Sequence, residues 1–194
     1  MNMLHKWTAS AVLLAGLAAF STAHAESSFV TGAGAINADA RLDFRIVIPK
    51  FIRFQVGSVG ATIDLVDFDV PAANVGDGNA IARTNGGAVP VLLQSNAGDV
   101  SLTGTTTGGL TDGVEFISFD EITSTSSNAD LAAPVLVDGG SSAVVTVTPN
   151  VGTRVVNRTA NWTFEYENSN FVAAGTYGGV NTNNGRVVYT AALP

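Results

Sequence analysis

The side chains best suited to chemistry in this chain are closely spaced carboxylates. Asp64, Asp67 and Asp69 lie near one another, and Asp120 is followed directly by Glu121. Paired carboxylates can serve as acid and base in glycoside hydrolysis. However, strand alternation places Asp67 and Asp69 on one face, which is also the pattern of a solvated strand edge. We therefore expect these carboxylates to be surface groups and assign no catalytic residue.

The residue inventory removes most other catalytic chemistry. The chain has no cysteine, and its two histidines, His5 and His24, both precede residue 26. Thiol catalysis, a Ser-His-Asp triad and histidine-ligated zinc are thereby excluded for the chain beyond residue 25. The only lysine there is Lys50, and no Gly-x-Ser-x-Gly motif occurs. The sequence predicts a protein that is not an enzyme and has no cofactor.

Two ligand classes stay open, calcium and saccharide. Asp77 with Asn79, or Asn96 with Asp99, offers oxygen ligands for calcium. The spacing of a twelve-residue calcium loop is missing, and turn formation explains these residues as well. We assign no metal ligand.

Aromatic side chains are the candidates for sugar binding. Trp162, Tyr166, Tyr177 and Tyr189 are the residues that could form a stacking platform. Core packing explains Trp162 better, because it lies in a strand that alternates strictly between large apolar and polar residues. Tyr177, beside two glycines, is the least certain of these positions.

The first 25 residues have the pattern of a secretory signal peptide. Lys6 lies in a short polar start, residues 9–20 are mostly apolar, and an Ala-x-Ala sequence ends at Ala25. The apolar run is shorter than the roughly 20 residues of a membrane-spanning helix. The sequence predicts Sec-type export to the periplasm, the cell surface or the medium, without a transmembrane anchor.

The charge balance argues against nucleic acid and against an anionic membrane as the partner. Without Lys6, eight basic residues face 16 acidic ones, which leaves a net charge of −8. Nucleic-acid binding requires a basic patch, and no such patch is present. An anionic membrane surface is disfavoured for the same reason. The acidic balance is typical of a protein kept in solution by its charge.

The remaining pattern predicts an all-β domain over residues 41–194. Alternation predicts strands at residues 41–48, 51–56, 61–70 and 161–167, among others. A C-terminal hairpin is expected to pair residues 176–182 with residues 186–192 across an Asn-Asn-Gly turn. Many short strands separated by turns are typical of a sandwich or barrel. Uneven strand lengths favour an antiparallel β-sandwich of the immunoglobulin-like or jelly-roll type.

Residues 26–40, here called the arm, continue the alternation ahead of the expected sandwich. Its small or apolar positions are Val30, Gly32, Gly34, Ile36 and Ala38. With residues 41–48 they form one face over 19 residues, far longer than a usual strand. One explanation is a flexible leader up to about residue 37. The other is a donor strand that pairs with a neighbouring subunit.

These features together resemble secreted fimbrial, or pilin-type, subunits. The resemblance rests on the signal peptide, the cysteine-free strands, the alternating arm and the sequence Ala174-Gly175-Thr176-Tyr177 before the last strand. In that family an N-terminal extension completes the sandwich of the next subunit by strand addition. The resemblance implies a non-enzymatic structural or adhesive surface protein that associates with itself or with another surface subunit. The alternative is an extracellular or periplasmic module that binds sugar or calcium.

Overall fold

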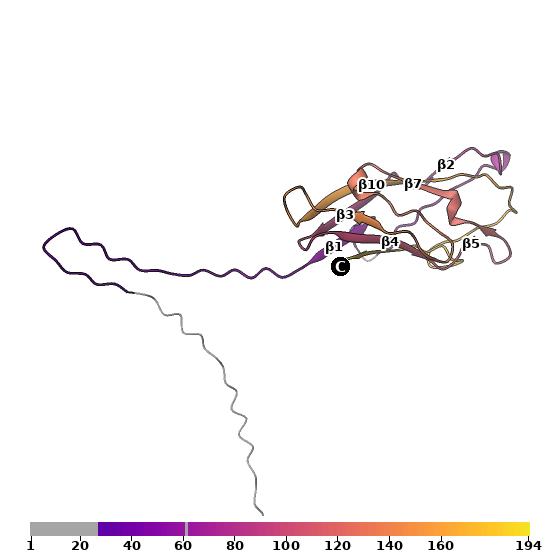
Figure 1. The fold of residues 1–194 in the computed structure, drawn as a ribbon. Helices are drawn as coiled ribbons and strands as arrows, with labels where there is room; N and C mark the ends of the chain where they lie inside the picture. The colour runs from indigo at the N-terminus through magenta and orange to yellow at the C-terminus, as the bar shows by residue number, and fades with distance from the viewer. Residues whose placement is uncertain (1–26, 61) are drawn as a thin grey trace, which may run out of the picture. The chain divides into compact units, whose positions relative to one another are not determined.

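The computed structural model describes residues 27–60 and 62–194, which form two separate units (Figure 1). The first unit ends at Ile48, and the second, Pro49–Pro194, contains all the strands. The expected signal peptide at 1–25 lies outside the described residues. The compact second unit thus begins eight residues after the sandwich start expected at residue 41.

Long strands with alternating burial build the first sheet, which is antiparallel throughout. Its order is β1, β3, β10 and β2, and β7 pairs with the end of β10. The strands are β1 (Ile52–Val56), β2 (Ile81–Ala82), β3 (Val89–Ser95), β7 (Ile122–Ser126) and β10 (Val156–Tyr166).

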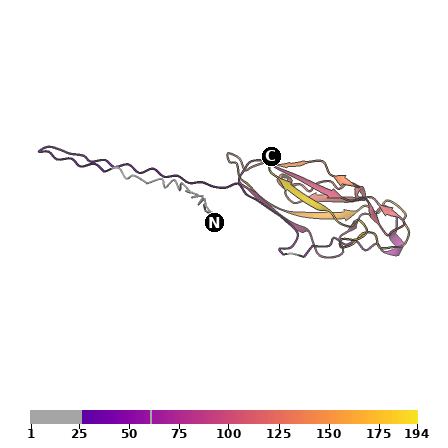
Figure 2. The ribbon, with the colours of Figure 1, turned by 90° about the horizontal axis from the view of Figure 1, so that it is seen from below.

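The second sheet is also antiparallel and packs against the first through its apolar face. Its order is β11, β4 and β8, and β9 also pairs with β4. These strands are β4 (Val100–Thr106), β8 (Gly140–Ser141), β9 (Val145–Val147) and β11 (Val188–Ala192), which is drawn in yellow in Figure 2. The remaining elements are a short ladder of β5 (Leu110–Thr111) with β6 (Phe116–Ile117) and the 3-10 turns η1 (Ala72–Asn74), η2 (Phe119–Glu121) and η3 (Ala129–Leu131).

The centre of β10 shows how the period-two pattern produces the core. Trp162, Phe164 and Tyr166 are buried, while Thr163 and Glu165 between them are exposed. The indole Nε1 of Trp162 donates to the carbonyl of Leu131 at 3.0 Å, so the polar atom of this fully buried ring is satisfied. The all-β antiparallel sandwich expected from the sequence is confirmed, with Trp162 and Phe164 in its core.

Two of the strands predicted from the sequence, both before residue 71, do not form. Residues 41–48 and 62–70 contain no strand, although both alternate. Alternation marks which side chains share a face, but a strand also needs a neighbour for its main-chain hydrogen bonds. Around residues 67–69 those bonds go to loop residues instead. The carbonyl of Asp67 accepts from Thr84 N at 2.7 Å, and Asp69 N donates to Thr84 Oγ1 at 2.7 Å.

The expected C-terminal hairpin is also absent, although its turn forms. Gly185 N donates to the carbonyl of Thr182 at 2.8 Å. Residues 176–182 form no ladder, and Gly178 N donates to Thr111 O of β5 at 3.1 Å. The last strand, β11, pairs with β4, far away in the sequence. A local turn signal therefore identified the turn but not the partner of the strand that follows it.

Candidate functional site

The N-terminal unit carries a row of large apolar side chains exposed to solvent. Leu42 is 67% exposed, Phe44 and Ile46 are each 86% exposed, and Ile48 is 75% exposed. All described residues from 27 to 48 are exposed, and none lies in a strand. Leaving four such side chains in water forgoes roughly 1.5–3 kcal/mol for each that a partner would bury. This exposed apolar row is therefore a candidate interaction site.

The five residues that the sequence singled out belong to the same exposed unit. Val30 is 40% exposed and Ile36 is 50% exposed. Gly32 has little free space, because a Cβ placed on it would lie 3.3 Å from Ile36 Cγ2. Gly34 has open space around it, and Ala38 is exposed. A bend at residues 33–34 interrupts the extended chain between Gly32 and Ile36. Leu42, Phe44, Ile46 and Ile48, which the sequence had assigned to the sandwich, are exposed as well.

Among the described strands, β11 pairs with β4 alone, so one side of β11 is a sheet edge. Gly104 of β4 bonds to β8, since Ser142 N donates to its carbonyl at 2.8 Å and its own N–H donates to Ser142 Oγ at 3.0 Å. Tyr189, which lies opposite Gly104, therefore forms a non-hydrogen-bonded pair with it. The N–H and C=O groups of Tyr189 and of Ala191, two residues on, point to the free side of β11.

The same reasoning identifies the free side of β1 in the other sheet. Gly57 N donates to the carbonyl of Pro90 at 2.8 Å, continuing the β1–β3 ladder past the end of β1. Because main-chain direction alternates, Gln55 faces β3, and Ile52 and Phe54 point their main-chain groups away from it. Strands β1 and β11 lie close together, so two free edges from different sheets border one side of the sandwich.

The side chains along these two edges only partly close the core. Phe54 and Val56 of β1, Tyr189 and Ala191 of β11, and Leu193 pack against the buried cluster yet remain half-buried. The ring of Tyr189 packs against Trp162 with a centroid distance of 5.2 Å, and burial raises the pKa of its hydroxyl. Here apolar side chains that contact the core lie beside unpaired main-chain groups, the combination that strand addition uses.

The carboxylates considered for catalysis act as acceptors for their own surroundings. Asp64 Oδ2 accepts from Ser58 N at 2.7 Å. Glu121 is buried and accepts from Ser169 N at 3.3 Å and from the side-chain amide of Asn170. In this way Glu121 fixes the chain that leaves β10.

The calcium candidates are likewise engaged in structural bonds. Asn96 holds the residues just before β1, because its Oδ1 accepts from Phe51 N at 2.9 Å and its Nδ2 donates to Pro49 O at 2.8 Å. Asp77 accepts from Asn74 Nδ2 at 2.8 Å and from the buried Asn168 Nδ2 at 3.0 Å. Within residues 27–60 and 62–194, no group of three or more acidic or histidine side chains is placed to hold a metal ion.

Donors around Asp77 set its protonation. Hydrogen bonds, the largest from Asn74 and then from Asn79, lower the pKa of Asp77 from 3.8 to about 2. A lowered pKa means that the folded state favours the carboxylate, so the contribution to stability is complete above 3.8 and is lost as pH falls through about 2. We expect the stability difference between the parent and Asp77→Asn to shrink over that interval in thermal unfolding. A difference that does not change with pH would contradict this account.

The aromatic residues do not form a sugar-stacking platform. Trp162 is fully buried and Tyr166 is 5% exposed, so neither ring can contact a ligand on the surface. Tyr177 lies elsewhere, and its hydroxyl donates to Ala173 O at 3.0 Å. The core explanation for Trp162 is confirmed and extends to Tyr166.

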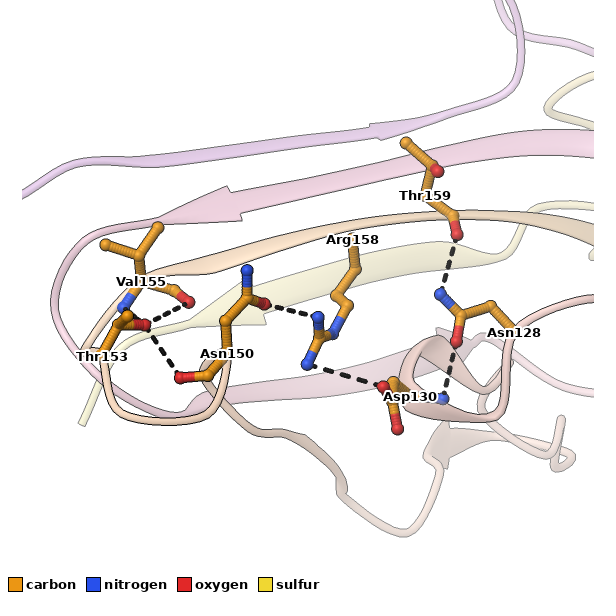
Figure 3. A network of polar contacts seen from close by, with 7 residues as sticks. All are labelled: Asn128, Asp130, Asn150, Thr153, Val155, Arg158 and Thr159. Carbon is orange, nitrogen blue, oxygen red and sulfur yellow. Dashed lines mark hydrogen bonds and ion pairs between the residues drawn. The ribbon is translucent and has the colours of Figure 1, made fainter.

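A polar network closes one end of the sandwich around a core-facing arginine (Figure 3). Arg158 lies at an inward position of β10 between a loop and η3, donating to the side-chain oxygen of Asn150 and pairing with Asp130 at 3.5 Å. Asn128 caps η3 by accepting from Asp130 N at 3.0 Å and also donates to Thr159 O at 3.0 Å. These bonds hold two loops onto β10, and we assign the network a structural role.

Comparison of the chain with protein-family models, with curated proteins and with solved structures finds no match. Among the described residues, the structure has no helix long and apolar enough to cross a membrane. The candidate site consequently rests on its own geometry, namely the exposed apolar row of the N-terminal unit and the open edges of β1 and β11.

Proposed function

We propose that this chain is an exported, non-enzymatic structural or adhesive surface protein that assembles by β-strand addition, as a fibre subunit does. One observation carries the proposal. The same chain has an exposed alternating apolar segment, residues 30–48, that lies in no strand, and a sandwich whose strands β1 and β11 are sheet edges among the described residues. The two features are complementary in chemistry.

Strand addition would bury the exposed apolar segment and pair the open strand edges in one step. An extended segment beside β11 can bond to the free N–H and C=O groups of Tyr189 and Ala191. Its inward positions, spaced every second residue, would then cover the half-buried side chains at the open edge. Leu42, Phe44, Ile46 and Ile48 have that spacing, and each is at least 67% exposed. If the bend at residues 33–34 straightened on assembly, Val30, Gly32, Gly34, Ile36 and Ala38 would extend the same face with smaller groups.

Charge favours a second copy of the chain as the acceptor. Residues 27–48 contain two acidic and two basic residues and are therefore neutral, whereas residues 49–194 contain 13 acidic and six basic residues. A neutral donor segment can approach an acidic domain without the repulsion that like charges would impose. Assembly through such a segment keeps the excess negative charge on the outer surface of each subunit.

The experiment is sedimentation and electron microscopy of the mature chain, residues 26–194. The proposal predicts linear particles or a ladder of oligomers, and a chain that starts at Pro49 should remain a monomer. A mature chain that stays strictly monomeric at high protein concentration would contradict self-assembly.

A further inference from the structure

A small polar pocket lies between the end of β4 and the turn that precedes β11. Its volume is about 220 Å³, and its lining consists of Thr107, Asn181, Thr182, Asn183, Asn184, Gly185 and Arg186. This is below the roughly 300 Å³ at which pockets for drug-sized ligands begin, and suits one small polar ring. Hydroxyl, amide and guanidinium side chains line the pocket, and no acidic side chain does.

The turn that forms the pocket is held in place by neighbouring chain segments. Asn184 Nδ2 donates to Gly109 O at 3.0 Å, and Thr111 N donates to Asn183 O at 3.1 Å. Gly185 admits no side chain, since a Cβ there would lie 2.3 Å from Gly179 N. These contacts hold the backbone of the turn and the side-chain amide of Asn184 in place before any ligand arrives.

The backbone of this turn is itself unusual. Asn181, Asn183 and Asn184 all have positive φ, at 56°, 49° and 60°. In the described part of the chain, Asn168 is the only other non-glycine residue with a positive φ. Asparagine tolerates this conformation better than most residues, but clusters of left-handed residues are characteristic of ligand sites.

Arg186 is the charged group of the pocket, and its guanidinium is not engaged by the described part of the chain. It is half-buried, and it makes no hydrogen bond or ion pair with any residue in 27–60 or 62–194. Asp138 accepts from Phe119 N at 2.8 Å and Asp112 accepts from Val114 N at 2.8 Å, so both carboxylates bond main-chain groups outside the pocket. In an acidic protein, an unpaired guanidinium of this kind is available for an anionic ligand.

We propose that this pocket binds a single carboxylate-bearing sugar unit, such as a uronic acid. The guanidinium of Arg186 would pair with the carboxylate through two parallel hydrogen bonds. The amides of Asn181 and Asn183 and the hydroxyls of Thr107 and Thr182 would hydrogen-bond the sugar hydroxyls, for which they supply both donors and acceptors. The mixed lining favours a sugar over a simple carboxylate, which would use Arg186 alone.

The site also gives the proposed surface protein a chemical target, although it does not depend on assembly. The pocket belongs entirely to the second unit and includes no residue of the N-terminal unit. A chain that assembles but does not bind the sugar would contradict only the pocket proposal. A chain that binds but stays monomeric would contradict only the assembly proposal.

The test is saturation-transfer NMR on the mature chain, which observes the ligand and works whether or not the protein assembles. The probes are methyl glucuronide, its neutral counterpart methyl glucoside, and N-acetylaspartate as a carboxylate without a sugar ring. We expect transfer to methyl glucuronide and much weaker transfer to the other two. Equal transfer to methyl glucoside, or none to the glucuronide, overturns the proposal, and stronger transfer to N-acetylaspartate points to an acidic peptide instead.

Matched variants place the site on the structure. Arg186→Gln should weaken glucuronide binding by roughly tenfold or more, the loss expected for one charge-assisted pair. Arg154→Gln removes the same charge from an exposed position outside the pocket and should leave binding unchanged. Asn181→Gly keeps a residue that favours positive φ and removes only the amide, so it should weaken binding without altering the melting temperature. Unchanged binding in Arg186→Gln, or equal losses in the two arginine variants, overturns the assignment.

Discussion

Replacing Phe164 with alanine is expected to lower the free energy of unfolding by about 3–5 kcal/mol. Phe164 lies on the inward face of β10, is 5% exposed and belongs to the central apolar cluster. Removing its ring forfeits the burial of the aromatic surface and leaves a cavity that the neighbouring strands can fill only in part. Since small domains are marginally stable, a loss of this size removes a large share of the total.

Urea unfolding followed by tryptophan fluorescence measures this loss, with Thr163→Ala as the matched control. Thr163 is the neighbouring residue on the exposed face of the same strand, so its replacement should change stability by about 0.5 kcal/mol or less. Similar effects of the two variants would show that β10 does not bury the face assigned to it.

A single charge on the apolar face of the N-terminal unit is expected to abolish assembly while the sandwich stays folded. Ile36→Asp and Phe44→Asp each place a carboxylate where an acceptor would bury an apolar side chain. Burying an unpaired charge costs far more than one such contact contributes. Because Ile36 is half-exposed and Phe44 is 86% exposed in the free chain, neither substitution should lower the melting temperature.

Substitutions at odd-numbered positions, on the other face of the segment, test whether an added charge by itself prevents assembly. Asn37→Asp and Val47→Asp add the same carboxylate to the other face of the extended segment, and we expect both variants to assemble like the parent. Sedimentation and micrographs compare all four variants. If Ile36→Asp unfolds the monomer, Ile36 belongs to the sheet of its own domain and strand donation fails. If all four variants match the parent, the segment up to about residue 37 is a leader without a role in assembly.

How far the sequence predicted the fold depends on the range of the interactions involved. Alternation in residues 161–167 placed Trp162 and Phe164 in the core correctly, because burial of one strand face is a local pattern. The same pattern over residues 41–48 predicted a strand of the sandwich that does not form. Alternation records which residues share a face, whereas the choice between an intramolecular partner and an external one depends on the rest of the chain.

The candidate site required information that no local pattern holds. The exposed row from Val30 to Ala38 was identified from its spacing, but the free edge of β11 follows only from the pairing of Gly104 with Ser142. The Asn-Asn-Gly sequence indicated a turn at residues 183–185. This turn lines a pocket together with Thr107 and Arg186 because β11 pairs with β4. The two strands are far apart in the sequence, so no local pattern predicts their pairing.

The most direct test of strand addition is amide hydrogen exchange at the free edge. A chain starting at Pro49 is mixed with a peptide of residues 39–50, and exchange is followed at Tyr189 and Ala191, with Thr190, whose amide faces β4, as the internal control. The account predicts slower exchange at Tyr189 and Ala191 with the parent peptide and no slowing with a peptide carrying Phe44→Asp and Ile46→Asp. Unchanged exchange at both amides under saturating parent peptide, or equal slowing by the two peptides, would contradict it.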